Sequence, residues 1–250
     1  MLNIVVPMAG RGSRFAVAGY IDPKPLIKVC GKEMIRLVIG NIRPECEHRF
    51  IFMCLQEHID KYAVDKKLAA WCPGCIIIPV KAVTEGAACT VLLAERYINS
   101  NEPLMIANSD QWVDIDINRY LAAGKNADGL IMTMKSQNQK WSFVRFDDIG
   151  QVCEVVEKQV VSDEATVGIY NFVRGADFVI YAHRMIDAGL RVNGEFYVAP
   201  VYNQMVKDGG VIKTYNIGTD VNGMYGLGTP DDLNSFLTLE VCKRAVEEAV

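Results

Sequence analysis

Two segments near the N-terminus carry residues suited to holding phosphate groups. The first is a glycine-containing loop at residues 8–14, and the second is Asp22-Pro23-Lys24-Pro25. Glycine lets backbone N–H groups approach a ligand closely, and the prolines stiffen the backbone around Lys24. The loop residues of interest, in chain order, are Met8, Ala9, Gly10, Gly12 and Ser13. Together with the charges of Arg14 and Lys24, the two segments predict a site that neutralises a triphosphate.

Two common phosphate-binding motifs do not fit this loop. A dinucleotide fingerprint requires a third glycine where Phe15 stands, and a Walker A loop requires Gly-Lys-Ser/Thr, whereas Gly31-Lys32 is followed by Glu33. Taken singly, the glycine pair is also compatible with a plain turn, and Lys24 with a solvated side chain. The order of the two segments, a strand-end loop and then a proline-flanked lysine, favours the phosphate site.

Hydrophobic patterning predicts the elements that position these residues. Short apolar segments alternate with amphipathic ones in the first half, and we predict strands at residues 3–7, 49–55, 76–80 and 103–107 and helices near 33–41, 58–71 and 85–98. In the second half we predict strands at 129–135, 142–146, 152–157, 166–173 and 211–217 and helices at 177–188, 200–207 and from 229 towards 250. This pattern indicates an α/β fold with a mixed, mostly parallel central sheet flanked by helices, in which ligands bind beyond the carboxyl ends of the strands.

Composition excludes several classes of protein. The chain has 250 residues, half of them hydrophobic, with 26 Lys+Arg against 30 Asp+Glu and a net charge of −4. That balance argues against general binding to nucleic acid or to anionic membranes. No apolar run approaches the roughly 18 residues of a membrane helix, and the N-terminus lacks the basic region of a signal peptide. We expect a single cytoplasmic domain over 1–250, with eight reduced cysteines.

The two N-terminal segments resemble the opening signature of the nucleotidyltransferase family that makes nucleotide-activated sugars. They read PMAGRGSRF and DPKPLIKVCGKEMI here, and the resemblance continues over nearly the whole chain. It implies a GT-A-like, Rossmann-like fold and an enzyme that joins a nucleoside triphosphate to a phosphorylated acceptor with release of pyrophosphate. The sequence is most similar to a small branch associated with capsule and surface polysaccharides, which includes enzymes for unusual acceptors such as phosphoglutamine.

The resemblance assigns a nucleotide-binding half to residues 1–125. It implies that Glu85 and Gly86 lie against the nucleobase, that Asn108 contacts the nucleotide and that Asp110 binds Mg²⁺. A carboxylate at a strand end suits Mg²⁺, which also binds substrate phosphates. Lys81 stands where pyrimidine-using relatives often carry glutamine, and it only donates hydrogen bonds. If Lys81 reaches the base, cytosine with its acceptors at N3 and O2 fits better than uracil, which favours CTP.

Residues 126–250 form the acceptor-binding half in this resemblance. Lys158 is expected at the acceptor phosphate, and the other acceptor-binding residues are Glu157, Gly168, Glu195 and Tyr197. Strand alternation places Glu154, Val156 and Lys158 on one face and Glu157 on the other. Where many relatives carry a second metal-binding aspartate, this chain has Gly226. Either Asp110, phosphates and water hold the metal, or Asp220 substitutes through a different loop path.

The implied reaction is in-line attack of an acceptor phosphate oxygen on the α-phosphorus of the triphosphate. Arg14 and Lys24 would stabilise the departing pyrophosphate, Asp110 would hold Mg²⁺ and Lys158 would steer the acceptor. Two other functions fit the sequence. One is a noncatalytic nucleotide-binding relative, which the absence of a carboxylate at Gly226 favours, and the other is a GT-A glycosyltransferase. The identity of the acceptor is not set by the sequence, and neither is the oligomeric state, a homo-oligomer included.

Overall fold

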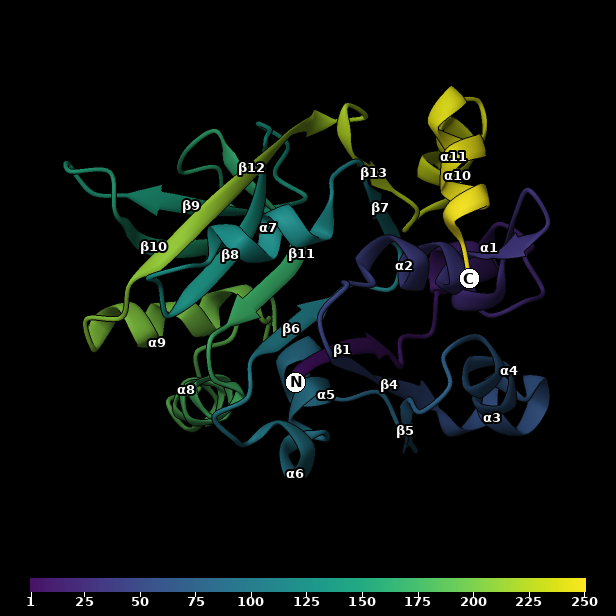
Figure 1. Ribbon diagram of the computed structural model, residues 1–250, viewed down its shortest axis with the longest axis horizontal. Helices are drawn as coiled ribbons and strands as arrows, with labels where there is room; N and C mark the ends of the chain where they lie inside the picture. The colour runs from purple at the N-terminus through teal and green to yellow at the C-terminus, as the bar shows by residue number, and fades with distance from the viewer.

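The computed structural model describes residues 1–250, and one eleven-stranded sheet runs through it. The sheet begins with four parallel strands in the order β5-β4-β1-β6. Their bounds are Leu2–Met8 (β1), His48–Leu55 (β4), Ile76–Val80 (β5) and Leu104–Ala107 (β6). These strands match the four that the sequence predicts in its first half. Because they are parallel, the loops that follow them meet at one edge of the sheet (Figure 1).

The second half of the chain extends the same sheet. Strand β11 (Glu164–Phe172) runs antiparallel to β6, and the order continues β11-β8-β12-β13-β7, with the hairpin β9-β10 attached to β11. The remaining bounds are Gln111–Val113 (β7), Gly129–Lys135 (β8), Ser142–Phe146 (β9), Val152–Glu157 (β10), Ile212–Asp220 (β12) and Gly223–Gly226 (β13). A two-residue pair, β2 (Lys28–Val29) and β3 (Lys32–Glu33), stands apart. The predicted mixed α/β sheet is confirmed.

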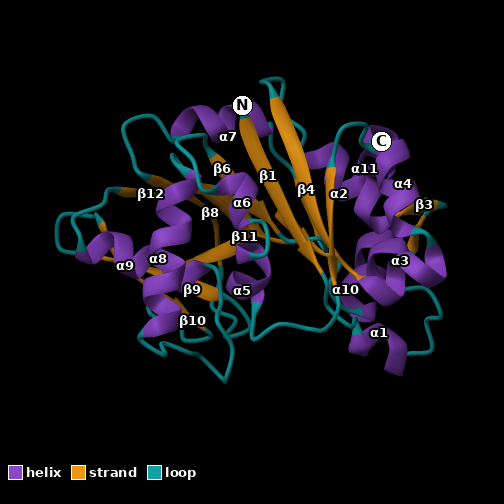
Figure 2. Ribbon diagram, turned by 90° about the horizontal axis from the view of Figure 1, so that it is seen from below, coloured by secondary structure: helices purple, strands orange, loops and turns teal.

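Helices cover both faces of the strands (Figure 2). In the first half they are Ser13–Val17 (α1), Met34–Ile42 (α2), Gln56–Tyr62 (α3), Val64–Trp71 (α4), Ala87–Leu92 (α5), Glu95–Ile98 (α6) and Ile117–Ala123 (α7). Gly175–Asp187 (α8) and Tyr202–Lys207 (α9) follow, with one-turn 3-10 helices at Lys24–Leu26 (η1) and Ala199–Val201 (η2).

Two of the helices predicted in the first half of the chain are each two shorter ones. The prediction of one helix over 58–71 is wrong because Ala63 has a φ of 50°, a left-handed conformation that ends α3 and starts α4 at an angle. The prediction of one helix over 85–98 is wrong in the same way, since Leu93 and Ala94 separate α5 from α6. Both breaks depend on the backbone conformation of residues other than glycine or proline, and hydrophobic spacing does not predict breaks of this kind.

The core lies on both faces of the sheet. Along β1, Ile4 and Val6 point into one cluster with Val38 of α2, whereas Val5 points into another with Phe178 of α8. All five side chains are fully buried. Strict alternation of this kind holds a strand in register, because a shift by one residue would exchange the two faces. The N-terminal phosphate loop is thus attached to a rigid strand.

Two helices close the chain, α10 (Pro230–Leu237) and α11 (Glu240–Glu248), where one helix was expected. They pack beside α2, so the C-terminus lies close to the N-terminal segments (Figure 1). Gly40 of α2 makes this possible, because a Cβ there would lie only 2.4 Å from the Glu248 carbonyl oxygen. Lys32 adds a hydrogen bond to the Ala249 carbonyl at 2.7 Å. This arrangement fixes the segment that precedes α10, which reaches the candidate site.

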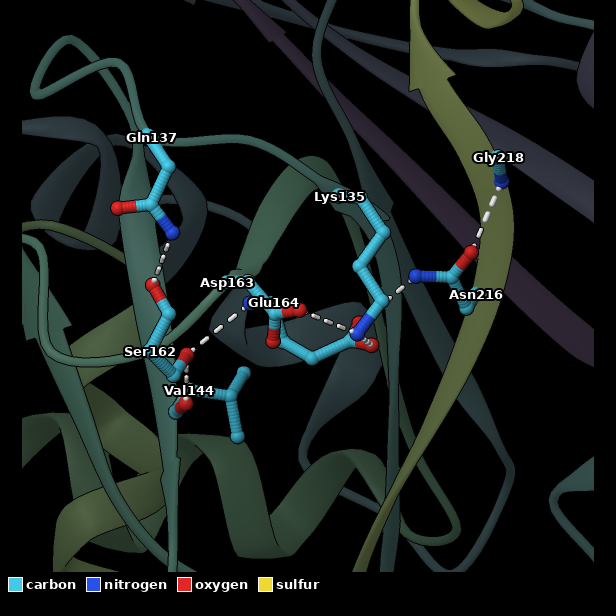
Figure 3. A network of polar contacts seen from close by, with 8 residues as sticks. All are labelled: Lys135, Gln137, Val144, Ser162, Asp163, Glu164, Asn216 and Gly218. Atoms are coloured by element: carbon cyan, nitrogen blue, oxygen red, sulfur yellow. Dashed lines mark hydrogen bonds and ion pairs between the residues drawn. The ribbon is translucent and has the colours of Figure 1, made fainter.

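A polar network joins β8, β11 and β12 in the second half (Figure 3). Glu164 is its centre: it accepts from Lys135 Nζ at 2.8 Å and from Asn216 Nδ2 at 2.9 Å. Lys135 also pairs with Asp163 at 2.9 Å, and the Ser162 hydroxyl donates to the Val144 carbonyl. The network therefore ties three neighbouring strands and the β9 edge to one another. No helix in the structure has the length and apolar character that crossing a membrane requires.

Candidate active site

Lys24 and Asp110 form an ion pair at the edge where the parallel strands end. Lys24 Nζ lies 2.8 Å from Asp110 Oδ2, although the two residues are 86 positions apart. Glycines pack against both partners: a Cβ on Gly12 would lie 3.1 Å from the Lys24 Cβ, and one on Gly228 would lie 2.7 Å from Asp110 Oδ2. The pair therefore sits where four separate segments of the chain pack closely together.

The glycine loop presents backbone rather than side chains at its start. Met8 and Ala9 are buried, and the Met8 side chain belongs to the core, so only their backbone groups could serve a ligand. Gly10 and Ser13 are exposed, and nothing lies within 4 Å of a Cβ placed on Gly10. The loop is thus open towards solvent at Gly10.

A cavity of about 480 Å³ gathers seven of the predicted site residues, including all four predicted acceptor-binding ones. These seven are Arg14, Asn108, Glu157, Lys158, Gly168, Glu195 and Tyr197. Arg14 and Asn108 come from the first half of the chain and the others from the second half. Lys24 and Asp110 do not line this cavity, and neither do Lys81, Glu85 and Gly86. The structure therefore brings the predicted acceptor residues together and places the predicted nucleotide residues around them.

Lys158 reaches the cavity through an unusual backbone conformation. Its φ is 56°, so β10 ends at Glu157 and the next side chain turns out of the strand pattern. The prediction that Lys158 and Glu157 face opposite sides is wrong for this reason, and both residues line the same cavity. Lys158 Nζ donates to the Tyr197 hydroxyl at 2.6 Å, and this hydrogen bond raises the pKa of Lys158. The ammonium group is therefore charged and held in place.

Glu157 is a buried carboxylate in the wall of this cavity. It pairs in register with Ser142 across the β9-β10 hairpin, and the Ser142 hydroxyl donates to it. Burial raises the pKa of Glu157 above its usual range, Glu195 raises it further, and the Ser142 hydrogen bond and Lys158 oppose this. Lys140, Trp141 and Ser142 also line the cavity and were not predicted from the sequence, and Thr166 and Tyr170 line it from β11. Of the first three residues, only Ser142 could have been predicted, because the register of the β9-β10 hairpin places it opposite Glu157.

Gly168 is required by the packing of Asn108. It has a φ of 82°, and a Cβ there would lie 2.0 Å from Asn108 Nδ2 and 2.9 Å from Gln111 Oε1. The Asn108 N–H also donates to the Gly168 carbonyl at 3.0 Å. Gly168 thus positions Asn108 at the floor of the cavity.

Gly86 is required by close packing against the backbone of Phe196. Its φ is 139°, and a Cβ there would overlap the backbone of Phe196 at 2.4 Å. The Phe196 N–H donates to the Glu85 carbonyl at 2.8 Å, and the Ala88 N–H donates to the Phe196 carbonyl at 3.0 Å. The Glu85 carboxylate forms an ion pair with Arg191. This loop therefore fastens the predicted acceptor segment at 195–197 to the nucleotide half.

A second cavity of about 520 Å³ lies where β1, β4 and β5 end. Its lining includes Arg11 after β1, Glu57 and His58 after β4, and Lys81 after β5. Burial lowers the pKa of His58, which keeps the imidazole neutral near pH 7. Lys81 thus lies apart from the acceptor cavity, at the carboxyl ends of parallel strands, where ligands of such sheets bind.

The residues around Asp110 fit Mg²⁺ when substrate phosphates complete its ligands. Mg²⁺ is typically held by one or two carboxylates together with phosphates and water, and no group of three or more His, Cys, Asp or Glu side chains lies close enough to hold a metal without them. At Gly226, a Cβ would lie 3.5 Å from the Asp232 Cγ. The first turn of α10 thus brings a carboxylate to the place where a Gly226 side chain would stand, and the sequence analysis, which considered Asp220, missed it. Lys140 Nζ lies between Asp232 and Asp220, at 3.7 and 3.6 Å.

Comparison with known proteins agrees with this fold. A family model described as nucleotidyl transferase matches residues 4–190, and the chain belongs to this family. A nucleoside-diphosphate-sugar pyrophosphorylase from Vibrio cholerae RC9 superposes with a TM-score of 0.80 at 25% identity, covering 94% of this chain and 100% of that one. The expected class of enzyme, a nucleotidyltransferase, is confirmed.

Two more distant structures share the fold. The inositol-1-phosphate CTP transferase from T. maritima superposes with a TM-score of 0.76 at 17% identity, covering 98% of this chain and 95% of that one. A UDP-glucose pyrophosphorylase complexed with UDP-glucose gives 0.74 at 16% identity and 99% of both chains. No curated protein matches the sequence.

Proposed function

We propose that the protein transfers a nucleoside monophosphate from a nucleoside triphosphate to a phosphorylated small molecule and releases pyrophosphate. The single observation that carries the proposal is the convergence of Arg14, Lys158 and Asn108 on one cavity beside the Lys24–Asp110 pair. Two anions must meet in this reaction, so fixed positive charge at both ends of the cavity is its main requirement. The nucleotide lies along residues 1–125 and the acceptor along 126–250.

The reaction needs alignment and charge neutralisation more than proton transfer. An ionised phosphate oxygen of the acceptor attacks the α-phosphorus, the new P–O bond forms as the bond to the β-phosphate oxygen breaks, and pyrophosphate leaves. No general base is required because the attacking oxygen is already ionised. Lys158 holds the acceptor phosphate, while Lys24 and Arg14 neutralise the leaving pyrophosphate. Mg²⁺, which neutralises phosphate charge when bound, would be held by Asp110 with Asp232 nearby.

The favoured nucleotide is CTP. Its support is Lys81, which stands at the end of β5 in the second cavity and offers donors but no acceptor. The favoured acceptors are sugar 1-phosphates, as in the Vibrio cholerae pyrophosphorylase named above, or an unusual phosphorylated molecule such as phosphoglutamine. The product would be a precursor for a capsule or another surface polysaccharide, made in the cytoplasm.

The test is pyrophosphate release with Mg²⁺ across CTP, UTP, dTTP, ATP and GTP, each combined with a panel of sugar 1-phosphates and phosphoglutamine. We expect release with one pair, lost in Lys24→Ala and in Lys158→Ala. Nucleotide binding without release on any acceptor would contradict the proposal and favour a noncatalytic binding protein. Consumption of a nucleotide sugar without pyrophosphate would favour a glycosyltransferase.

A further inference from the structure

Two carboxylates, Glu157 and Glu195, line the acceptor cavity beside Lys158 and form neither an ion pair nor a hydrogen bond with a cation of the protein. Glu157 lies in its wall against Ser142, and Glu195 stands on the loop before Phe196. The Glu195 side chain makes no hydrogen bond and no ion pair, although its backbone bonds to Val192. An ionised carboxylate only accepts hydrogen bonds. Glu195 is exposed, so water solvates its carboxylate in the free protein, and a ligand that displaces this water must present donors.

Both carboxylates line the same cavity as Lys158, so the three charges act on one another. Each raises the pKa of Lys158, and Glu195 also raises that of Glu157. Lys158 itself is committed to the Tyr197 hydroxyl and, in the proposed function, to the acceptor phosphate. Once a phosphate takes the Lys158 charge, Glu157 and Glu195 remain as two neighbouring anions in a partly buried site. Such a pair is costly unless a cation comes between them.

The other two cations that line the cavity are Lys140, which has other partners, and Arg14, which has another role in the proposed function. Lys140 lies 3.6–3.7 Å from Asp220 and Asp232 and covers the Trp141 ring at 4.6 Å. Arg14 stands on α1 after the glycine loop and, in the proposed function, neutralises the leaving pyrophosphate. Neither is bonded to Glu157 or Glu195 in the structure. The missing positive charge is therefore left to the ligand.

Resting on the proposed function, we propose that the acceptor is a phosphorylated amine whose ammonium group binds between Glu157 and Glu195 while Lys158 holds its phosphate. An amino sugar phosphate or a phosphorylated amino alcohol belongs to this class. The ammonium group donates up to three hydrogen bonds and neutralises the carboxylates. Neutral sugar hydroxyls would satisfy the same acceptors and leave both negative charges uncompensated, so they are weaker ligands for this cavity.

Matched acceptors test the proposal: glucosamine 1-phosphate and glucose 1-phosphate differ in charge and hardly in shape, while N-acetylation removes the charge and adds an acetyl group. Glucosamine 1-phosphate, N-acetylglucosamine 1-phosphate and glucose 1-phosphate would be compared by kcat/KM for pyrophosphate release with the active nucleotide. Galactosamine 1-phosphate and O-phosphoethanolamine extend the amine set. We expect amines to exceed their neutral counterparts by about 10-fold or more, the scale of one hydrogen bond to a charged group. Equal rates, or faster reaction of neutral sugars, would overturn the amine proposal and leave the nucleotidyltransferase standing.

Two variants and a control locate the effect. Glu195→Gln keeps the shape and removes the charge, and we expect it to lower kcat/KM for amines about 10-fold and for neutral sugars by less than about threefold. Glu157→Gln should behave likewise. Glu154→Gln is the matched control: it lies on the same strand β10, pairs with Arg145 at 3.4 Å and does not line the acceptor cavity. An equal loss for amines and neutral sugars in Glu195→Gln would contradict the proposal.

Calorimetric binding of the same acceptors gives a readout that does not depend on catalysis. Tighter binding of the amine, weakened in Glu195→Gln, is the expected result. If neither turnover nor binding is seen with any phosphorylated acceptor, the proposed function and this inference both fail. If neutral acceptors bind and react while amines do not, only the inference fails.

Discussion

Lys24 and Asp110 neutralise each other across two loops that are 86 residues apart in the chain, with 2.8 Å between Nζ and Oδ2. In the proposed reaction one of them faces pyrophosphate and the other faces Mg²⁺, so both must give up this contact when the nucleotide enters. Pairing them in the free protein keeps both side chains in place and avoids leaving either charge alone. About four fifths of each side chain is covered, so an unpaired charge on either residue would be costly in the free protein.

Replacing Lys24 should affect the rate much more than the fold. For Lys24→Ala we expect a loss of roughly 10²–10³ in the rate of pyrophosphate release, the usual effect of one group that stabilises transition-state charge. The free energy of unfolding should fall by only about 1 kcal/mol, because a single partly exposed ion pair contributes little. Lys28→Ala is the control, since Lys28 is exposed and pairs with Glu33. Similar kinetic losses in both variants would show that charge near η1, and not Lys24 itself, matters.

Substitution of Gly168 should lower stability through Asn108. In Gly168→Ala the new Cβ would meet Asn108 Nδ2 at 2.0 Å, so Asn108 must move. Gly209→Ala separates backbone strain from contact, because Gly209 has a φ of 84° against 82° for Gly168 and no atom within 4 Å of a Cβ. We expect Gly168→Ala to cost about 1–3 kcal/mol more than Gly209→Ala by chemical denaturation. Adding Asn108→Ala should recover part of that difference, and no recovery would show that another contact is responsible.

The sequence predicted the strands better than the details of the site. Alternating apolar residues such as Ile4, Val5 and Val6 report directly on two buried faces, so β1 and its neighbours were predictable. The left-handed backbone at Ala63 and Lys158 was not, because neither residue type favours positive φ. That one dihedral angle at Lys158 decides on which side of β10 its ammonium lies.

The sequence also could not predict which residues approach the site from elements that are distant in the chain. Asp232 approaches Gly226 only because α10 begins at Pro230 and turns back. Lys140 depends on the path of the loop before β9. Such approaches follow from tertiary packing, and no spacing along the chain encodes them.

The burial of Glu157 predicts a pH dependence of stability. Its pKa is raised in the folded protein, so its ionisation costs stability: the contribution is fully present below the ordinary value near 4.5 and is lost as pH rises through the raised value. Glu157→Gln cannot ionise, so its free energy of unfolding relative to the wild type should rise as pH increases from about 4.5 and level off above the raised pKa of Glu157. Urea titrations across this range measure it. A constant difference would mean that Glu157 has an ordinary pKa. Lys158, Glu195 and Ser142 face this group and should be kept intact.

The last prediction concerns the carboxylate beside Gly226. If Asp232 assists Asp110 in holding Mg²⁺, Asp232→Asn should raise the Mg²⁺ concentration for half-maximal activity about 10-fold, in line with the cost of losing a supporting metal contact, and Asp110→Asn should raise it more. Mn²⁺ binding in the presence of nucleotide, followed by electron paramagnetic resonance, gives the same comparison without turnover. Asp231→Asn is the matched control, because it removes the same charge from the neighbouring exposed position of α10.

A double variant that moves the carboxylate from position 232 to position 226 tests this prediction more directly. A Cβ on Gly226 would lie at an ordinary contact distance of 3.5 Å from the Asp232 Cγ, so truncating Asp232 leaves room for a side chain there. The double variant Gly226→Asp with Asp232→Ala should therefore regain metal affinity that Asp232→Ala alone loses, because the carboxylate returns to the same space from the strand side. Equal metal affinity in the wild type and in Asp232→Ala would remove Asp232 from the site and leave Asp110, phosphates and water as the ligands.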